Sequence, residues 1–135
     1  MINSAEEFVR LRRSEKTEEY SRASLEEAPI EVWRAVLSNY PDMAFWVAQN
    51  KTVPYDILET LADHQESRVR SMVASKTKLQ EALLLKFASD SDDGVRMNVA
   101  RHKKATANIL NQLTNDSWEE ISNLALERIK NGNHK

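Results

Sequence analysis

Short runs of apolar residues at helical spacing recur along most of the chain. Ile57, Leu58, Leu61 and Ala62 stand at positions i, i+1, i+4 and i+5, and Pro54 precedes them where a helix commonly starts. A polar stretch then ends the segment. This pattern predicts a short helix that buries one face.

A second helical stripe follows directly. Val69, Met72 and Val73 stand at i, i+3 and i+4, and the small Ala74 after them would let a neighbouring backbone approach closely. A helix of about nine residues is only about 13 Å long and is not stable alone in water. Each pair of helices must therefore bury its apolar faces against another pair.

The pair of helices repeats with a period of about 26 residues. The pairs related by this shift are Val69-Arg70 with Val95-Arg96, Val73-Ala74 with Val99-Ala100, and Leu58 with Leu84 and Leu110. A shift of 25 fits better between the first two units. The pattern predicts an all-α protein, an α-solenoid of about four two-helix repeats that each pack on their neighbours.

The repeats define the expected domain organisation. We expect an N-terminal helical cap in residues 1–28, the solenoid in residues 29–130 and a disordered tail in residues 131–135. Ser4 and Glu7 have capping-box spacing, and a second weak helix is predicted from Thr17 to Glu27. A mobile arm that grips a partner is the alternative for residues 1–28.

The repeated motifs resemble a known family. Leu61-Ala62-Asp63, Val69-Arg70 and Val73-Ala74, with their later copies, resemble HEAT-like repeats, especially the short leucine-rich variant (LRV) type, over residues 29–129. The resemblance implies an α-solenoid that binds other proteins and has no shared catalytic residue. Ala44 and Ser122 replace the motif arginine in the first and last units, as capping units would.

Composition excludes several kinds of chemistry. The chain of 135 residues has the length of one domain, and it has no cysteine, which excludes disulfides, thiolate zinc sites and cysteine nucleophiles. Two glycines are too few for a glycine-rich phosphate loop, and no serine lies in a nucleophile elbow. We therefore expect no enzyme, no catalytic residue and no cofactor.

Metal binding is not expected either. The segment 90–94 is acidic, but Gly94 is its fifth residue and Arg101 stands twelfth, where a calcium loop needs a bidentate acid. His64, His102 and His134 lack the i, i+4 spacing of a helical zinc site.

Targeting signals are weak. The N-terminus is acidic where a signal peptide is basic, and the longest apolar run, residues 43–48, is far shorter than the ~20 residues of a membrane helix. We expect a cytoplasmic protein that makes no membrane contact.

Charge is unevenly distributed although the formal net charge is only −2. No acid occurs in residues 43–55, 67–80 and 94–115, which are the second helix and exit turn of successive units. Stacking would align their bases along one edge. The expected basic edge consists of Lys51, Lys76, Lys78, Arg101, His102, Lys103 and Lys104. It could be an ordinary solvated edge, or it could bind an acidic protein surface or nucleic acid.

The two repeated arginines are interpreted as structural. Stacking would bring Arg70 near Asp63, and Arg96 near Asp90 or Asp92, which predicts a charge-assisted ladder between neighbouring units.

Aromatic residues concentrate in the first unit. Trp33 occupies a core position, whereas Trp46 shares its position with Asn98, which would need a buried partner inside a core. We expect that position to border a groove, with Phe45 and Tyr55 as candidate exposed anchors.

Two functions follow. The first is a non-enzymatic module that binds an unknown protein or peptide through its groove or basic edge. The alternative is nucleic-acid binding through the basic edge, a role resembling that of HEAT-like alkylpurine DNA glycosylases, although none of their catalytic residues can be matched.

Overall fold

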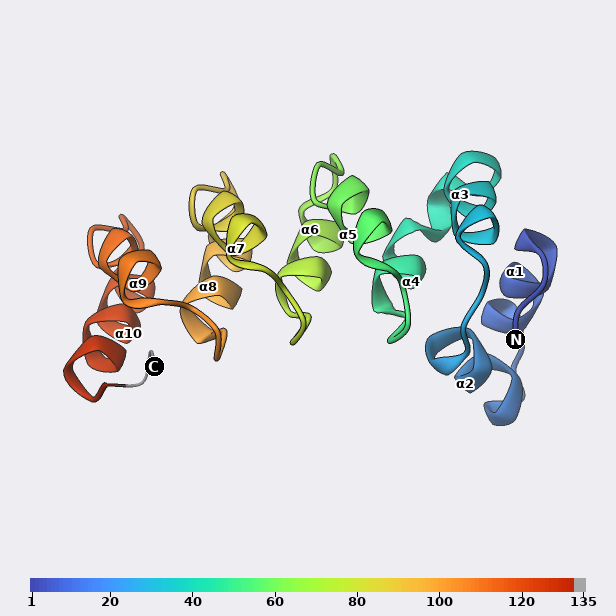
Figure 1. Cartoon of the computed structure of the whole chain (residues 1–135), viewed down its shortest axis with the longest axis horizontal. Helices are drawn as coiled ribbons and strands as arrows, with labels where there is room; N and C mark the ends of the chain where they lie inside the picture. Colours follow the sequence, from blue (N-terminus) through green and yellow to red (C-terminus); the bar gives the residue numbers. More distant parts are fainter. Residues whose placement is uncertain (133–135) are drawn as a thin grey trace. The chain divides into compact units, whose positions relative to one another are not determined.

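The computed structural model describes residues 1–132. Within these residues the chain forms ten α-helices, one short 3-10 helix and no strand, so the all-α prediction is confirmed (Figure 1). Of the expected tail, residues 133–135 lie outside the described part. The α-helices are α1 (Ala5–Arg13), α2 (Thr17–Leu25), α3 (Ile30–Asn39), α4 (Ala44–Gln49), α5 (Tyr55–Leu61), α6 (Ser67–Ala74), α7 (Glu81–Ala88), α8 (Asp93–Arg101), α9 (Ala107–Leu113) and α10 (Glu119–Lys130).

The chain divides into two compact units. Unit 1 spans Met1–His64 and unit 2 begins at Gln65. In unit 1, α1 packs against α2 and α3, and α4 packs against α2, α3 and α5. The Phe8 and Trp33 rings meet edge to face with centroids 5.2 Å apart, and both side chains are fully buried. Trp33 is therefore a core residue, as predicted.

Residues 1–28 belong to unit 1, and hydrogen bonds join them to one another and to the segment that follows α4. Ser4 caps α1 by accepting a hydrogen bond from the N–H of Glu7, as its spacing predicts. The N–H of Ile2 donates to the Glu27 carbonyl at 2.8 Å, and that of Lys51 donates to the Ser24 carbonyl at 2.9 Å.

In unit 2 the helices contact one another in alternation. α8 packs against α6 and α10, while α7 packs against α9, and Figure 1 shows α7 and α9 on the opposite side of the unit from α8 and α10. Val69, Leu84 and Val95 are almost completely buried between them. The predicted apolar stripes are thus the residues that fill the core of this unit.

Candidate functional site

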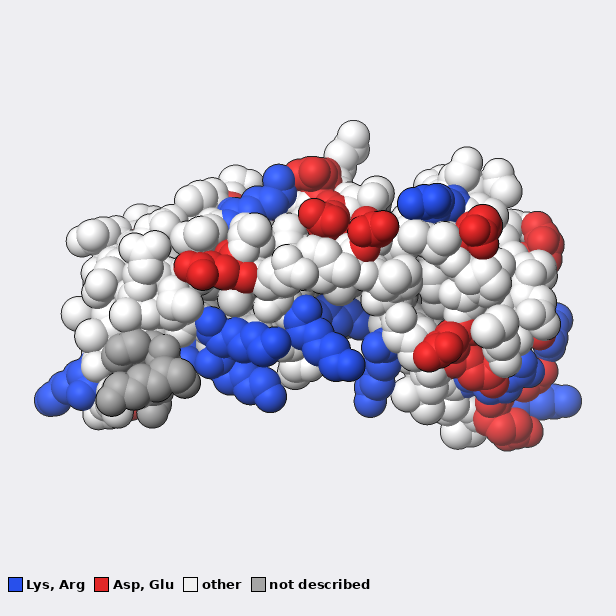
Figure 2. Space-filling model, viewed as in Figure 1, with Lys and Arg blue, Asp and Glu red and all other residues white. Residues whose placement is uncertain are grey.

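The exit turns of α6 and α8 carry most of the predicted basic edge. Lys76 and Lys78 follow α6, Arg101 ends α8, and Lys103 and Lys104 follow it. Figure 2 shows Lys and Arg atoms gathered on the side of unit 2 where these turns lie. Within the described chain, Lys78, Arg101, Lys103 and Lys104 are exposed and form no ion pair.

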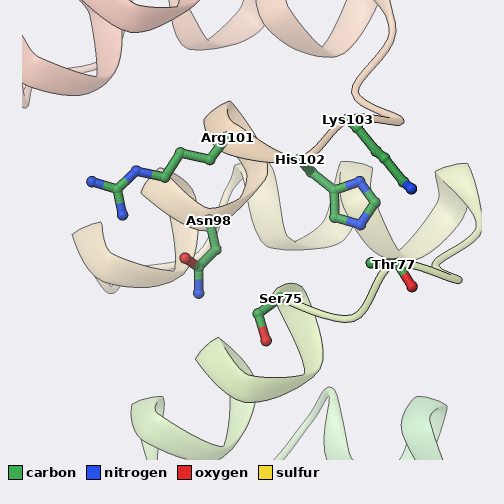
Figure 3. Close-up of a pocket in the computed structure, with 6 residues that line it drawn as sticks. All are labelled: Ser75, Thr77, Asn98, Arg101, His102 and Lys103. Atoms are coloured by element: carbon green, nitrogen blue, oxygen red, sulfur yellow. The ribbon is translucent and has the colours of Figure 1, made fainter. Parts of the chain in front are cut away.

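A pocket of about 290 Å³ lies between the two turns. Its lining contains two cations and no carboxylate. The lining residues are Ser75, Thr77, Asn98, Arg101, His102 and Lys103. In Figure 3 the His102 ring and Lys103 lie on the side of Thr77, whereas Arg101 extends from α8 in the opposite direction. The two cations therefore flank the pocket instead of converging on one point, an arrangement suited to an extended anionic ligand.

His102 holds the two turns together. Its side chain is only 6% exposed, its Nε2 lies 2.6 Å from the Lys76 carbonyl oxygen, and its Nδ1 accepts from the N–H of Lys104 at 3.1 Å. These contacts assign a neutral ring with the proton on Nε2. His102 thus positions the turns that carry the lysines.

Asn98 forms one wall of the pocket. Its Nδ2 donates to the Ser71 carbonyl at 2.9 Å and to the Ser71 Oγ at 2.8 Å, and the residue is half-buried. Asn98 therefore lines the pocket while its amide group is paired with Ser71 on α6.

The aromatic candidates are not exposed anchors. Phe45, Trp46 and Tyr55 are all half-buried. The Phe45 and Trp46 rings meet edge to face at 4.9 Å, and the Arg12 guanidinium lies 3.5 Å from the centroid of Trp46. Phe45 and Tyr55 are therefore less exposed than we expected, and Phe45 packs against Trp46. Lys51 also belongs to unit 1, so it forms no part of the surface described for unit 2.

Arg70 and Arg96 make the same structural contact twice. Arg70 donates through Nε and Nη2 to the two carboxylate oxygens of Asp90 at 2.8 and 3.0 Å. Arg96 donates in the same way to Asp116 at 2.8 and 3.3 Å. Each arginine reaches a carboxylate 20 residues later in the chain. These bidentate pairs occupy guanidinium groups that would otherwise be available to a ligand.

The carboxylate that Arg96 meets differs from the predicted one. The sequence indicated Asp90 or Asp92, but Arg96 reaches only the main-chain carbonyl of Asp90, at 2.8 Å, and pairs with the carboxylate of Asp116. The reason is that α8 packs against α10, which places the turn before α10 beside Arg96. Asp92 is occupied as the N-cap of α8, accepting from the N–H of Val95.

The paired aspartates have lowered pKa values. Burial works to raise the pKa of Asp116, but the hydrogen bonds from Arg96 and from the N–H of Trp118 outweigh it and hold the pKa below its usual value. The same balance of burial against hydrogen bonds from Arg70 and the Asp92 N–H lowers the pKa of Asp90. Both carboxylates stay ionised in mildly acidic solution and keep their arginines neutralised.

A periodic set of buried polar residues was missed by the sequence reasoning. Asn50 donates through Nδ2 to the carbonyls of Ala23 and Glu26, at 2.8 and 3.1 Å. Arg128 donates through Nη1 to the carbonyls of Ala100 and His102, at 2.8 and 2.7 Å. Asn50, His102 and Arg128 stand at multiples of 26 residues from one another, a polar period that could have been noticed beside the apolar one.

A second missed feature surrounds Trp118. This side chain is 47% exposed and lines a pocket of about 250 Å³. The other lining residues are Asp93, Gly94, Met97, Arg101 and Glu120. Arg101 therefore lines this pocket as well as the acid-free pocket. Trp118 lies outside the repeat positions that we compared, so periodicity gave no signal for it.

Other kinds of site receive no support. Residues 1–132 contain no group of three or more His, Cys, Asp or Glu side chains that could hold a metal ion. No helix in the same range is long and apolar enough to cross a membrane. Comparisons with protein-family models, with curated proteins and with solved structures found no match.

Proposed function

We propose that this chain is a non-enzymatic binding module that captures an acidic segment of a partner protein on its basic edge. The framework would be a stack of helical hairpins of the HEAT-like or LRV kind over residues 29–130. Three features of unit 2 support such a stack: the contacts of α8 with α6 and α10, the contact of α7 with α9, and the arginine–aspartate pairs that recur one period apart.

The observation that carries the proposal is that some basic side chains of unit 2 are paired with carboxylates and others are not. Arg70 and Arg96 are neutralised by bidentate contacts with aspartates. Arg101 and Lys103, which flank the acid-free pocket, form no ion pair within residues 1–132. Solvated charges of one sign beside a pocket attract a ligand of the opposite sign.

The net formal charges of the two units also support an acidic ligand for unit 2. From residue 65 onward the sequence has twelve Lys and Arg against nine Asp and Glu, an excess of three positive charges. Residues 1–64 have seven against twelve, an excess of five negative charges. An acidic ligand is therefore attracted to unit 2 specifically.

The test is charge reversal with a matched control. We expect a fluorescein-labelled acidic peptide of about twelve residues to bind the intact protein at low salt, measured by fluorescence anisotropy. Lys103→Glu with Lys104→Glu should weaken binding about tenfold or more. Lys86→Glu with Lys130→Glu changes the net charge equally outside both pockets and should have a much smaller effect.

Parallel titrations with DNA and RNA oligonucleotides of similar length decide the alternative. Tight oligonucleotide binding that weakens linearly with the logarithm of salt concentration and depends on Lys103 and Lys104 would replace our proposal with nucleic-acid binding. Absence of peptide binding, or equal effects of the two double variants, would refute the proposed site.

A further inference from the structure

The acid-free pocket and the Trp118 pocket adjoin along one face of α8. Gly94, Met97 and Arg101 stand at i, i+3 and i+7 on this helix and line the Trp118 pocket, while Arg101 also lines the acid-free pocket. The surface therefore continues from the basic edge past Arg101 to Trp118, whose side chain is 47% exposed.

The chemistry changes along this surface. The Trp118 pocket offers an indole ring and the Met97 thioether, which suit a large apolar side chain. It also contains two carboxylates, Asp93 and Glu120, which are absent from the first pocket. A polyanion such as a nucleic-acid strand would meet these carboxylates when it passed Arg101, so the surface favours a ligand that is anionic at one end only.

We propose that the two pockets form one groove for an extended peptide with acidic residues at one end and a large apolar residue nearby. The acidic residues lie against Arg101 and Lys103, and the apolar side chain lies against Trp118 and Met97. This inference rests on the proposed function and specifies its ligand.

The geometry of α8 sets the spacing within the peptide. Met97 and Arg101 are separated by about 6 Å along the helix axis, at about 1.5 Å per residue. An extended peptide covers that distance with about two residues, at about 3.3 Å each, and residues two positions apart point to the same face. The expected ligand therefore has its apolar residue about two positions from its acidic pair.

The test uses two peptides of equal charge. The first carries an Asp-Glu pair with a leucine two positions away, and the second has serine in place of the leucine. We expect the intact protein to bind the leucine peptide about tenfold more tightly, with its tryptophan emission moving to shorter wavelength on binding and no such shift in Trp118→Ala. Trp118→Ala should remove this preference, whereas Leu126→Ala, which truncates another exposed apolar side chain of α10, should keep it.

The outcomes separate the two proposals. If both peptides bind equally and Lys103→Glu with Lys104→Glu weakens both, the apolar half of the groove is refuted and the acidic-ligand function stands. If neither peptide binds, both proposals fail. Met97→Ala provides a second variant for the preference, should Trp118→Ala lose its helical circular dichroism.

Discussion

Arginine serves three different purposes at the residue scale in unit 2. Arg96 is 15% exposed and forms a bidentate pair with Asp116, which is 5% exposed. Arg128 is buried against main-chain carbonyls, and burial lowers the pKa of its guanidinium group. Arg101 is exposed between two pockets. Only the third kind is available to a ligand, so the number of arginines does not measure binding capacity.

The Arg96–Asp116 pair should contribute measurably to stability. Asp116→Asn keeps the size of the side chain but removes the charge that Arg96 faces, and we expect the free energy of unfolding to fall by roughly 2 kcal/mol. Urea titration followed by circular dichroism measures it. Arg68→Ala is the control, because its pair with Glu66 is solvent-exposed and should contribute under about 0.5 kcal/mol. Equal losses in the two variants would contradict the structural role.

The two aspartates should also make stability depend on acid. Their pKa values are lower in the folded chain than the ~3.9 of an unfolded aspartate, so the folded state binds fewer protons. The stabilisation is complete above the unfolded pKa and is lost as pH falls through the folded values. We expect Asp90→Asn with Asp116→Asn to flatten the pH dependence of unfolding free energy below about pH 4. An unchanged pH dependence in that range would contradict the contribution of the two aspartates to stability.

At the element scale, the short helices are stabilised by polar side chains that contact main-chain carbonyls about 26 residues earlier in the chain. α4 has only six residues and α6 has eight, lengths that cannot persist alone. Asn50 follows α4, His102 follows α8, and Arg128 lies in the last turn of α10. Each of these side chains contacts a main-chain carbonyl about 26 residues earlier in the chain. These contacts satisfy main-chain groups at helix ends, where intrahelical partners are missing.

Asn50 should anchor α2. Asn50→Leu leaves the carbonyls of Ala23 and Glu26 without these donors, and we expect a loss of about 2–3 kcal/mol in unfolding free energy. Amide exchange in α2 should accelerate at least about tenfold. Asn39→Leu, at the exposed end of α3, is the matched control. Unaltered exchange in α2 would mean that packing alone retains that helix.

At the scale of the whole molecule, the formal net charge of −2 conceals two units of opposite sign. A neutral total would suggest little electrostatic steering of an acidic ligand. The excess of positive charge in unit 2 predicts the reverse at its surface.

Association with the acidic peptide should therefore be faster at low salt. We expect the association rate constant, followed by stopped-flow anisotropy of the fluorescein-labelled peptide, to fall by roughly tenfold between about 20 and 500 mM NaCl, because the Debye length shortens. Lys103→Glu with Lys104→Glu should reduce this dependence. A rate that rises with salt would place the ligand near the acidic unit.

The order of residues by itself determined the helical class and core positions such as Val69 and Leu84, through the apolar stripes, and it also showed which stretches lack acidic residues. These depend on spacing within one helix, which the order of residues contains. The carboxylate that meets Arg96, the polar partner of Asn98 and the half-burial of Phe45 depended on which helices lie side by side. Pairing across 20 or more residues is decided by helix packing, so only the tertiary structure separated structural arginines from free ones and brought Trp118 beside Arg101.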